Sequence, residues 1–251
     1  MKSKLGQNFL KNKGSVFNFL NFCNISNSDS VLEIGVGQGA LTYDILAKNP
    51  KNYTGIEIEK SFADTFEFEF LDKKNRQIIN ADILRVDLQK IIKKQKITKI
   101  IGAIPYYISS PIIHKIIYES CKPLSEVYLI TQFEFAERVL GINRRSYFTN
   151  FIQNYCELNR GKKIKKECFY PKPKVDSMYF NLSFNNYPLS VKDAKKFSLF
   201  LHKGFKNPRK KITKAFKKEF LENLNINPNL RPENLSLLEW QSIHAKENSL
   251  N

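Results

Sequence analysis

Residues 31–42 read Val-Leu-Glu-Ile-Gly-Val-Gly-Gln-Gly-Ala-Leu-Thr. A short apolar run ends at Ile34, glycines follow at Gly35, Gly37 and Gly39, and a segment with helical spacing begins at Ala40. Glycines let the backbone turn sharply and approach a ligand closely. This order of strand, glycine loop and helix predicts the first unit of an α/β fold.

Further apolar runs alternate with helical segments along the chain. The expected strands are 31–34, 53–58, 77–80, 99–102 and 127–131, with helices at segments such as 40–48 and 111–119. Such alternation predicts a parallel, doubly wound sheet. Two later strands, expected at 151–158 and 175–182, have little helix between them and should pair antiparallel at one edge. The prediction is a mainly parallel, seven-stranded Rossmann-like sheet, the arrangement of class I methyltransferases.

The chain changes character after residue 184. Asn185-Asn-Tyr-Pro188 has the composition of a linker. Helices are expected at 192–205, 209–224 and 233–248, with a turn at 225–232. We therefore predict two domains, a ligand-binding catalytic domain at 1–184 and a small helical, RNA-binding domain at 185–251.

The charge balance indicates the kind of partner. The chain of 251 residues has 41 Lys and Arg against 24 Asp and Glu, a net charge of +17. Such an excess favours nucleic acid first and an anionic membrane second, although drift in composition could account for part of it. The four cysteines form no Cys-x-x-Cys pair and the three histidines lie far apart, so we expect no metal site. Without a signal core or a membrane-spanning run, a cytoplasmic protein with reduced thiols is expected.

Two carboxylates follow the next strands. Glu57 lies 22 residues after Gly35, and Asp82 closes the third strand. A carboxylate at the first position can accept hydrogen bonds from both ribose hydroxyls, and one at the second can accept from an adenine amino group. Together they predict an adenosine-containing cofactor across the carboxyl ends of the strands. The Gly-x-Gly-x-Gly spacing argues against a nicotinamide dinucleotide, which uses Gly-x-Gly-x-x-Gly.

A second loop indicates the reaction. Residues 99–111 read Lys-Ile-Ile-Gly-Ala-Ile-Pro-Tyr-Tyr-Ile-Ser-Ser-Pro. Residues 103–106 resemble the Asn-Leu/Ile-Pro-Tyr loop of enzymes that methylate the exocyclic amine of adenine, but Ala103 stands in the place of Asn. Joined to the glycine loop and the two carboxylates, this loop favours S-adenosyl-L-methionine as the cofactor.

The whole chain resembles the KsgA-type small-subunit ribosomal RNA adenine dimethyltransferases. Its most specific match is Phe169-Tyr-Pro-Lys-Pro-Lys-Val-Asp-Ser177, which has the family's Phe-x-Pro-x-Pro-x-Val-x-Ser pattern. Other matches are 7–10, 33–42, 57, 82, 104–111, 132–138, 205, 209–211 and 231–236. The large-subunit adenine methylases of macrolide resistance share the catalytic loop and a similar proline signature. Residues 108–111, 209–211 and 231–233 favour the small-subunit enzyme.

The resemblance implies dimethylation of N6 on two adjacent adenosines in the 3′-terminal hairpin loop of small-subunit rRNA, within an assembling ribosomal subunit. It also implies the residues of the site. The target adenine is expected near the catalytic positions Ala103, Ile104, Pro105, Tyr106 and Phe169. Cofactor contacts are expected at Gln7, Asn8, Leu10, Gly35, Gly37, Glu57, Ile58, Asp82, Ile83 and Ala103.

Ala103 should impair the reaction. The exocyclic nitrogen is a poor nucleophile, so the site must hold its N–H groups with the lone pair aimed at the methyl carbon. The family uses an Asn side chain and a backbone carbonyl, that of the residue before Pro105 or of Pro105 itself. Loss of one such preorganised group typically costs roughly 10²–10³ in rate. An engineered replacement and natural divergence to a non-catalytic assembly factor both stay open as the origin of Ala103.

Basic clusters predict the RNA-binding surface. A helix beginning near Arg209 would turn Ile212, Ala215, Phe216 and Phe220 to the core and leave its lysines outside. Solvated charge runs and membrane binding are the alternatives, but beside an adenine-methylating site phosphate contact is the better interpretation. The predicted RNA-binding residues are Arg144, Arg145, Lys162, Lys163, Arg209, Lys210, Lys211 and Lys214, on a protein expected to be monomeric.

Overall fold

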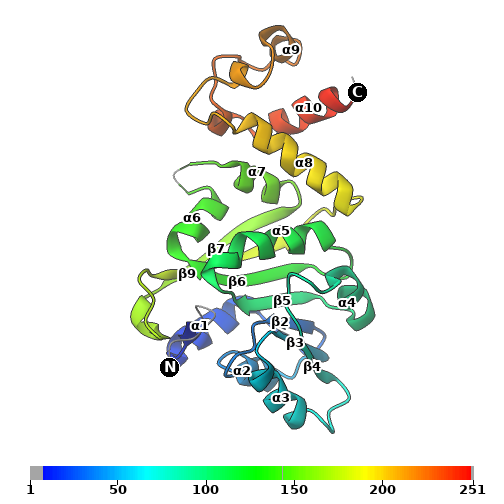
Figure 1. Ribbon diagram of the computed structural model, residues 1–251, viewed down its shortest axis with the longest axis vertical. Helices are drawn as coiled ribbons and strands as arrows, with labels where there is room; N and C mark the ends of the chain where they lie inside the picture. Colours follow the sequence, from blue (N-terminus) through cyan, green and yellow to red (C-terminus); the bar gives the residue numbers. More distant parts are fainter. Residues whose placement is uncertain (1–7, 143, 250–251) are drawn as a thin grey trace.

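The computed structural model describes residues 8–142 and 144–249. Its centre is a seven-stranded sheet built from β2 (Ser30–Ile34), β3 (Asn52–Glu57), β4 (Arg76–Asn80), β5 (Lys99–Ala103), β6 (Glu126–Gln132), β7 (Cys156–Ile164) and β9 (Ser177–Phe184). The strand order is β4-β3-β2-β5-β6-β9-β7 (Figure 1). The first five strands in this order, from β4 through β3, β2 and β5 to β6, are parallel to one another. Strand β9 is antiparallel to both β6 and β7. The predicted mainly parallel sheet with an antiparallel edge is confirmed.

Helices cover both faces of this sheet. One face packs against α4 (Leu88–Gln95), α5 (Ser109–Glu119), α6 (Phe133–Leu140) and α7 (Tyr147–Gln153). The other packs against α1 (Lys13–Cys23), α2 (Thr42–Ala47) and α3 (Lys60–Glu69). Because successive side chains of a strand point to opposite faces, neighbours such as Leu129 and Ile130 belong to different hydrophobic clusters.

A small second sheet holds the N-terminal segment in place. Strand β1 (Phe9–Leu10) pairs antiparallel with β8 (Phe169–Tyr170), which follows the short 3₁₀ helix Lys166–Cys168. Leu10 lies opposite Phe169, and both side chains are buried in the cluster beneath α1. This pairing was not expected from the sequence, and it brings the N-terminal segment beside the first sheet.

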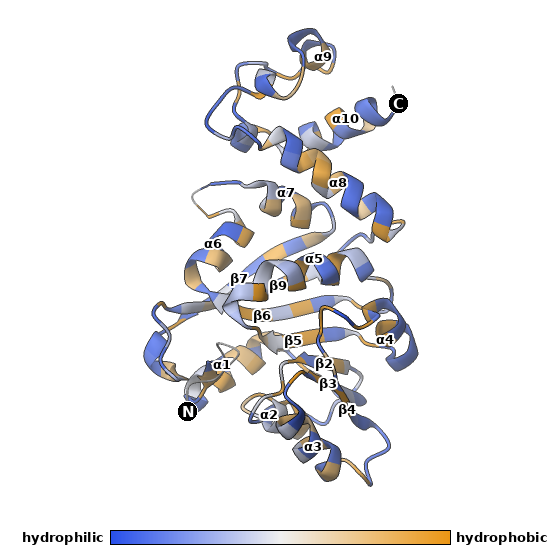
Figure 2. Ribbon diagram, in the orientation of Figure 1, coloured by the Kyte–Doolittle hydropathy of each residue, from blue (hydrophilic) through white to orange (hydrophobic). Residues whose placement is uncertain are grey.

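The C-terminal part is helical and lies at one end of the molecule (Figure 1). It comprises α8 (Val191–Gly204), α9 (Lys218–Glu222), α10 (Leu237–Asn248) and the 3₁₀ turns Ile212–Lys214 and Pro232–Asn234. The predicted helix at 192–205 is confirmed by α8, which carries alternating hydrophobic and hydrophilic bands (Figure 2). Trp240 is its fully buried centre, and a Cβ added to Gly204 would lie 2.3 Å from the Trp240 ring. Helix α8 shares one hydrophobic cluster with α5 and α7, so the expected division at residues 184 and 185 stays a prediction.

The strand expected at 151–158 is wrong in its first half. Residues up to Gln153 belong to α7, and β7 begins only at Cys156. Helix α7 begins with a capping box between Ser146 and Thr149. The buried residues in and just after this helix follow the i, i+3, i+4, i+7 spacing of a helix, at Phe148, Phe151, Ile152 and Tyr155. The partner strand matches better, since β9 covers most of 175–182 and pairs antiparallel with β7 as expected.

The helix expected at 209–224 is also wrong. The chain forms a 3₁₀ turn at Ile212–Lys214, is extended at Lys217 and becomes α-helical only at Lys218–Glu222. The Ile212 N–H donates to the Leu230 carbonyl at 2.7 Å rather than within a helix. A continuous helix would also place lysines of like charge at neighbouring positions, which is destabilising.

The last predicted helix begins later than expected. Residues 232–234 form a 3₁₀ turn, and Leu235 is extended. Helix α10 then begins after Ser236, which forms a capping box with Glu239. The Ser-x-x-Glu pattern was present in the sequence, so this start could have been predicted.

Candidate active site

A cavity of about 1000 Å³, open to solvent, lies at the carboxyl ends of β2, β3, β4 and β5. Strand β2 lies between β3 and β5, so this is the point where the order of the strands reverses and where ligands bind in such sheets. The predicted site residues that line it are Asn8, Leu10, Gly35, Gly37, Glu57, Ile58, Asp82, Ile83, Ala103, Ile104, Pro105 and Tyr106. Gln7 lies outside the described residues.

The glycine loop forms one wall of this cavity. Gly35 and Gly37 have φ values of 78° and 52°, in the left-handed region that favours glycine. A Cβ added to Gly37 would lie 2.9 Å from the ring of Phe9. The N-terminal strand β1 therefore packs directly on the turn, and only glycine allows this approach.

Glu57 is almost fully buried at the end of β3. Its Oε2 accepts a hydrogen bond from the Gly37 N–H at 2.7 Å, and its Oε1 accepts from the Glu59 N–H at 2.8 Å. These bonds link β3 to the glycine loop and fix the carboxylate. Each oxygen retains a further acceptor site for a ligand hydroxyl.

Glu33 also lines the cavity, although the sequence assigned it no role. Its Oε2 accepts from the hydroxyls of Tyr53 at 2.6 Å and Thr42 at 2.9 Å. Its buried Oε1 has no partner among the described residues. Burial raises the pKa of Glu33 to about 8, which the two hydroxyl bonds only partly offset. An acidic residue inside an apolar strand was the signal that could have identified it.

Asp82 and two isoleucines form the opposite wall. The Asp82 Oδ1 accepts from the Leu84 N–H at 2.9 Å, and its Oδ2 lies 3.6 Å from the Arg85 Nε. Ile58 and Ile83 line the same cavity. A carboxylate between two apolar side chains suits a flat ring that carries an amino group.

The loop after β5 offers one free carbonyl. The Pro105 oxygen already accepts from the Ile108 N–H and the Ser109 hydroxyl, both at 3.2 Å. Among the described residues no donor bonds to the Ile104 oxygen. The Tyr106 hydroxyl forms a 2.6 Å hydrogen bond with that of Ser177. Burial raises the pKa of Tyr106, against the effect of that bond, so its phenol is neutral.

Phe169 does not line this cavity. Its side chain is buried beside Leu10, on the cluster beneath α1, because the pairing of β8 with β1 turns it inward. The neighbouring Tyr170 is exposed. A contact between Phe169 and the target base stays a prediction.

Three of the predicted RNA-binding residues line one cleft, although they come from two distant parts of the sequence. Arg144 and Arg145, between α6 and α7, line it with Arg209 from the C-terminal part. Arg231, which the sequence did not single out for RNA, also lines it. Glu233 forms ion pairs with Arg144 and Arg231, so one carboxylate holds arginines from both parts of the chain.

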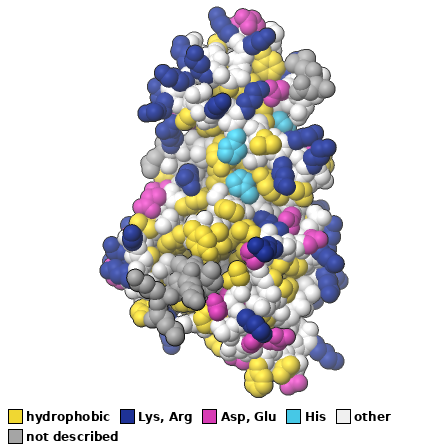
Figure 3. Space-filling view, viewed as in Figure 1, with side chains coloured by type: hydrophobic (Ala, Val, Ile, Leu, Met, Phe, Trp, Pro, Cys, Tyr) yellow, Lys and Arg dark blue, Asp and Glu magenta, His cyan; other side chains and the backbone are white. Residues whose placement is uncertain are grey.

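The predicted lysines divide into two groups. Lys210, Lys211 and Lys214 are exposed on the C-terminal part, where Lys and Arg side chains gather (Figure 3). Lys162 and Lys163 belong to β7 and do not line the arginine cleft. The Lys163 ammonium pairs with Asp176 at 2.8 Å and lies 4.6 Å from the centre of the Phe133 ring.

Neither a metal cluster nor a membrane helix was found in the described part of the chain. No group of three or more His, Cys, Asp or Glu residues there could hold a metal ion. None of its helices is long and apolar enough to cross a membrane.

Comparisons with known proteins identify relatives in both sequence and structure. The model of the family "Ribosomal RNA adenine dimethylase" matches residues 1–248. A ribosomal RNA small subunit methyltransferase A from Fusobacterium nucleatum is 36% identical, over 94% of this chain and 93% of its own. A dimethyladenosine transferase from Plasmodium falciparum has a TM-score of 0.81 at 25% identity, covering 96% of this chain and 98% of that one. The 23S rRNA methyltransferase ErmE has a TM-score of 0.70 at 20% identity, over 96% and 99%. The fold is that of class I methyltransferases, as predicted.

Proposed function

The chain belongs to the ribosomal RNA adenine dimethylase family, and from this premise we propose that it acts on N6 of two adjacent adenosines in the 3′-terminal hairpin loop of small-subunit rRNA. S-adenosyl-L-methionine is the proposed methyl donor. The observation that supports this most is a single cavity that joins Glu57 and Asp82 to the loop at 103–106.

The cavity suits an adenosine-containing donor in the chemistry of the residues that line it. Glu57 is proposed to accept from the ribose hydroxyls and Asp82 from the adenine amino group, with Ile58 and Ile83 against the ring. Asn8, Leu10, Gly35 and Gly37 are proposed to hold the amino-acid end, with Gln7 preceding them in the chain. When bound, this group supplies a methyl carried on a positively charged sulfur.

The loop at 103–106 is proposed to orient the target adenine. Because the Pro105 oxygen already has two donors, the Ile104 oxygen is the better acceptor for an N–H of the target amine. Tyr106 is proposed to lie against the base, which must leave its stack to reach this site. Fixing the N–H groups would turn the nitrogen lone pair into the cavity.

Ala103 is proposed to make this chain a slow enzyme. Its methyl group lines the cavity at the position where the family carries an amide. The backbone acceptor at Ile104 remains, but the second acceptor is missing. Transfer should therefore be slower by roughly 10²–10³ than with Asn at this position.

The arginine cleft and the nearby lysines are proposed to bind the rRNA backbone. Guanidinium groups bind phosphate in a bidentate manner, and Arg144, Arg145, Arg209 and Arg231 converge on one cleft. Lys210, Lys211 and Lys214 extend this surface, and Lys162 and Lys163 are proposed to contact the RNA separately. The proposed partner is the assembling small subunit in the cytoplasm, bound by a monomer of this chain.

A second function is favoured by Ala103 itself. A protein that binds the assembling subunit without methylating it would keep the cofactor cavity and the basic surface but would not need the amide. This non-catalytic assembly factor differs from the enzyme in one measurable property, the response to restoring Asn.

The test measures transfer of labelled methyl from S-adenosyl-L-methionine to small subunits that lack the modification. This chain is compared with Ala103→Asn and with Ala245→Asn, a matched change at an exposed position of α10. We expect the first variant alone to gain roughly 10²–10³ in rate. Large-subunit RNA serves as the alternative substrate.

Each outcome separates the proposals. Transfer by the Ala103→Asn variant alone supports the enzyme and the role of the amide. Equal transfer by all three proteins means that the Ile104 carbonyl suffices. Cofactor binding by calorimetry without transfer in any variant favours the assembly factor, and preference for large-subunit RNA selects the macrolide-resistance type.

A further inference from the structure

A second cavity adjoins the proposed active site. Its volume is about 610 Å³, and its walls come from the loop after β5 and from α6. Tyr106 and Tyr107 line both cavities. The opposite wall belongs to residues 132–138, a stretch that matched the family in sequence but has no role in the proposed reaction.

Three polar side chains of this wall form no hydrogen bond or ion pair within the described part of the chain. Gln132 ends β6, and Glu134 and Arg138 lie one turn apart on α6. Acidic and basic residues at this spacing commonly pair. Here the Arg138 guanidinium lies instead over the Phe135 ring, 5.1 Å from its centre.

The wall next to the active site is aromatic. Tyr107 is 64% exposed, so its ring is accessible from solvent. Tyr106 is held by its hydrogen bond with Ser177 and separates the two cavities. In Figure 3 hydrophobic side chains gather on the face near the beginning of α5 and α6. Exposed aromatic rings are the surfaces on which unstacked RNA bases stack.

We propose that this second cavity binds the adenosine next to the reacting one. Its base stacks on Tyr107, Gln132 and Glu134 contact its base edge, and Arg138 contacts its phosphate. A glutamine amide can bond both N6 and N7 of adenine. The Glu134 carboxylate accepts only, so it favours the exocyclic amine of adenine and disfavours the O6 of guanine. This inference rests on the proposed function, because it assumes that a target adenosine occupies the first cavity.

The test replaces the neighbouring base. Small subunits lacking the modification are prepared with unaltered rRNA or with guanosine in place of each of the two adenosines in turn. Dissociation constants are measured by filter binding with S-adenosyl-L-methionine present. The proteins are this chain, Glu134→Gln, Tyr107→Ala, and Glu137→Gln as a control on the same helix but outside the cavity.

We expect this chain to bind unaltered subunits about tenfold more tightly than at least one of the guanosine forms. Glu134→Gln should reduce that ratio to about twofold, because its amide can also donate to O6. Glu137→Gln should keep the tenfold ratio. Tyr107→Ala should weaken binding to both forms by about tenfold, since stacking depends little on base identity.

Two results would overturn the inference. One is a ratio near one for this chain, and the other is a ratio that Glu134→Gln leaves unchanged. Both still require tight binding to unaltered subunits, so the proposed function would survive them. Absence of any binding to unaltered subunits would instead overturn the proposed function together with this inference.

Discussion

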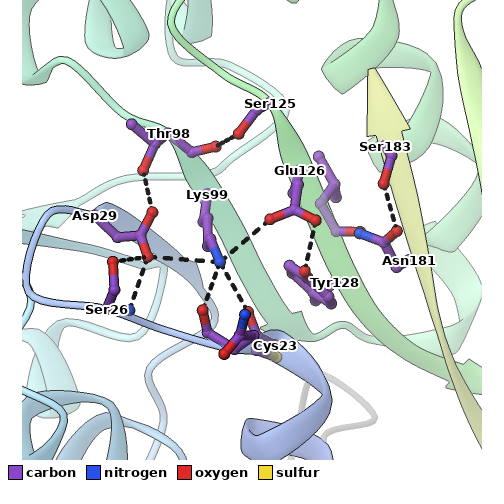
Figure 4. Close-up of polar contacts among 12 residues, drawn as sticks. Cys23, Ser26, Asp29, Thr98, Lys99, Ser125, Glu126, Tyr128, Asn181 and Ser183 are labelled. Carbon is purple, nitrogen blue, oxygen red and sulfur yellow. Dashed lines mark hydrogen bonds and ion pairs between the residues drawn. The ribbon is translucent and has the colours of Figure 1, made fainter. Parts of the chain in front are cut away.

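The polar groups at the two ends of β5 differ in whether they have hydrogen-bond partners. At its first residue, the Lys99 ammonium donates to the carbonyls of Cys23 at 3.0 Å and Asn24 at 2.7 Å (Figure 4). It also lies 3.2 Å from a Glu126 oxygen and 3.5 Å from an Asp29 oxygen. Acceptor oxygens thus outnumber the three N–H donors of this ammonium.

Near the carboxyl end of β5, two polar atoms lie without partners, one just after the strand and the other on the neighbouring strand β2. The Ile104 oxygen and the Glu33 Oε1 have no partner among the described residues. Both groups border the cavity proposed for the cofactor and the target base. A buried polar atom without a partner lowers the free energy of unfolding, because it destabilises the folded state.

The difference indicates that the Lys99 end of β5 serves stability and that the other end serves ligand binding. The Lys99 cluster satisfies the negative end of α1 and ties it to β5 and β6, as expected of a structural contact. The open end keeps its acceptors free, and a ligand can satisfy them. Changes at the first end should therefore alter stability without altering ligand binding. Changes at the second end should alter ligand binding or the way in which stability depends on pH.

The largest expected effect comes from Glu33. Its pKa is about 8 in the folded protein against an ordinary value of 4.5. Between these values the folded state retains a proton that the unfolded state has lost. Stability should therefore fall as pH rises, by up to about 1.4 kcal/mol per pH unit. Glu33→Gln has no such proton. The free energy of unfolding of this variant, minus that of this chain, should therefore rise by about 4 kcal/mol from pH 5 to pH 8.

Urea unfolding at pH 5, 6.5 and 8 measures this difference. The control is Glu137→Gln, which changes a half-buried carboxylate of α6 that lies outside both cavities. It should show no such pH-dependent gain. A constant difference between this chain and Glu33→Gln would mean that Glu33 is ionised throughout.

The second largest effect is expected at Lys99, the first residue of β5. Lys99→Met keeps the length of the side chain but leaves Asp29 and Glu126 without their cation. Burial acts to raise the pKa of Asp29, but hydrogen bonds from Ser26 and Thr98 and the charge of Lys99 hold it below its ordinary value. We expect a loss of about 3 kcal/mol in the free energy of unfolding. Lys94→Met on the exposed side of α4 should cost less than about 0.5 kcal/mol, and equal losses would contradict the structural role of Lys99.

Sequence reasoning worked best at the open end of the sheet. Glu57 ends β3 and Asp82 lies two residues after β4, and parallel strands bring their carboxyl ends to one edge. The positions of Glu57 and Asp82 in one cavity follow from that rule alone. Glu33 was missed because its strand was read as an apolar run, although the carboxylate inside it was visible.

Long-range contacts explain the errors elsewhere. The hydrogen bond from Ile212 to Leu230 replaces a helix, and no local pattern reveals it. The arginine cleft has the same origin, because Arg144 and Arg231 meet only through the packing of the C-terminal part. The helix at Tyr147–Gln153 is different, since the spacing of Phe148, Phe151 and Ile152 was available in the sequence.

The smallest effect is expected at Glu57, the last residue of β3. Glu57→Gln places an amide NH₂ where an oxygen now accepts from Gly37 or Glu59, and it removes the charge that would face ribose hydroxyls. Affinity for S-adenosylhomocysteine, measured by calorimetry, should fall about tenfold, or about 1.4 kcal/mol. Lys99→Met, measured in the same way at a temperature where it stays folded, should bind as tightly as this chain. Unchanged affinity in Glu57→Gln would place the ribose elsewhere. Weakened affinity in Lys99→Met would show instead that the two ends of β5 are coupled, and that stability and binding are not separated along this strand.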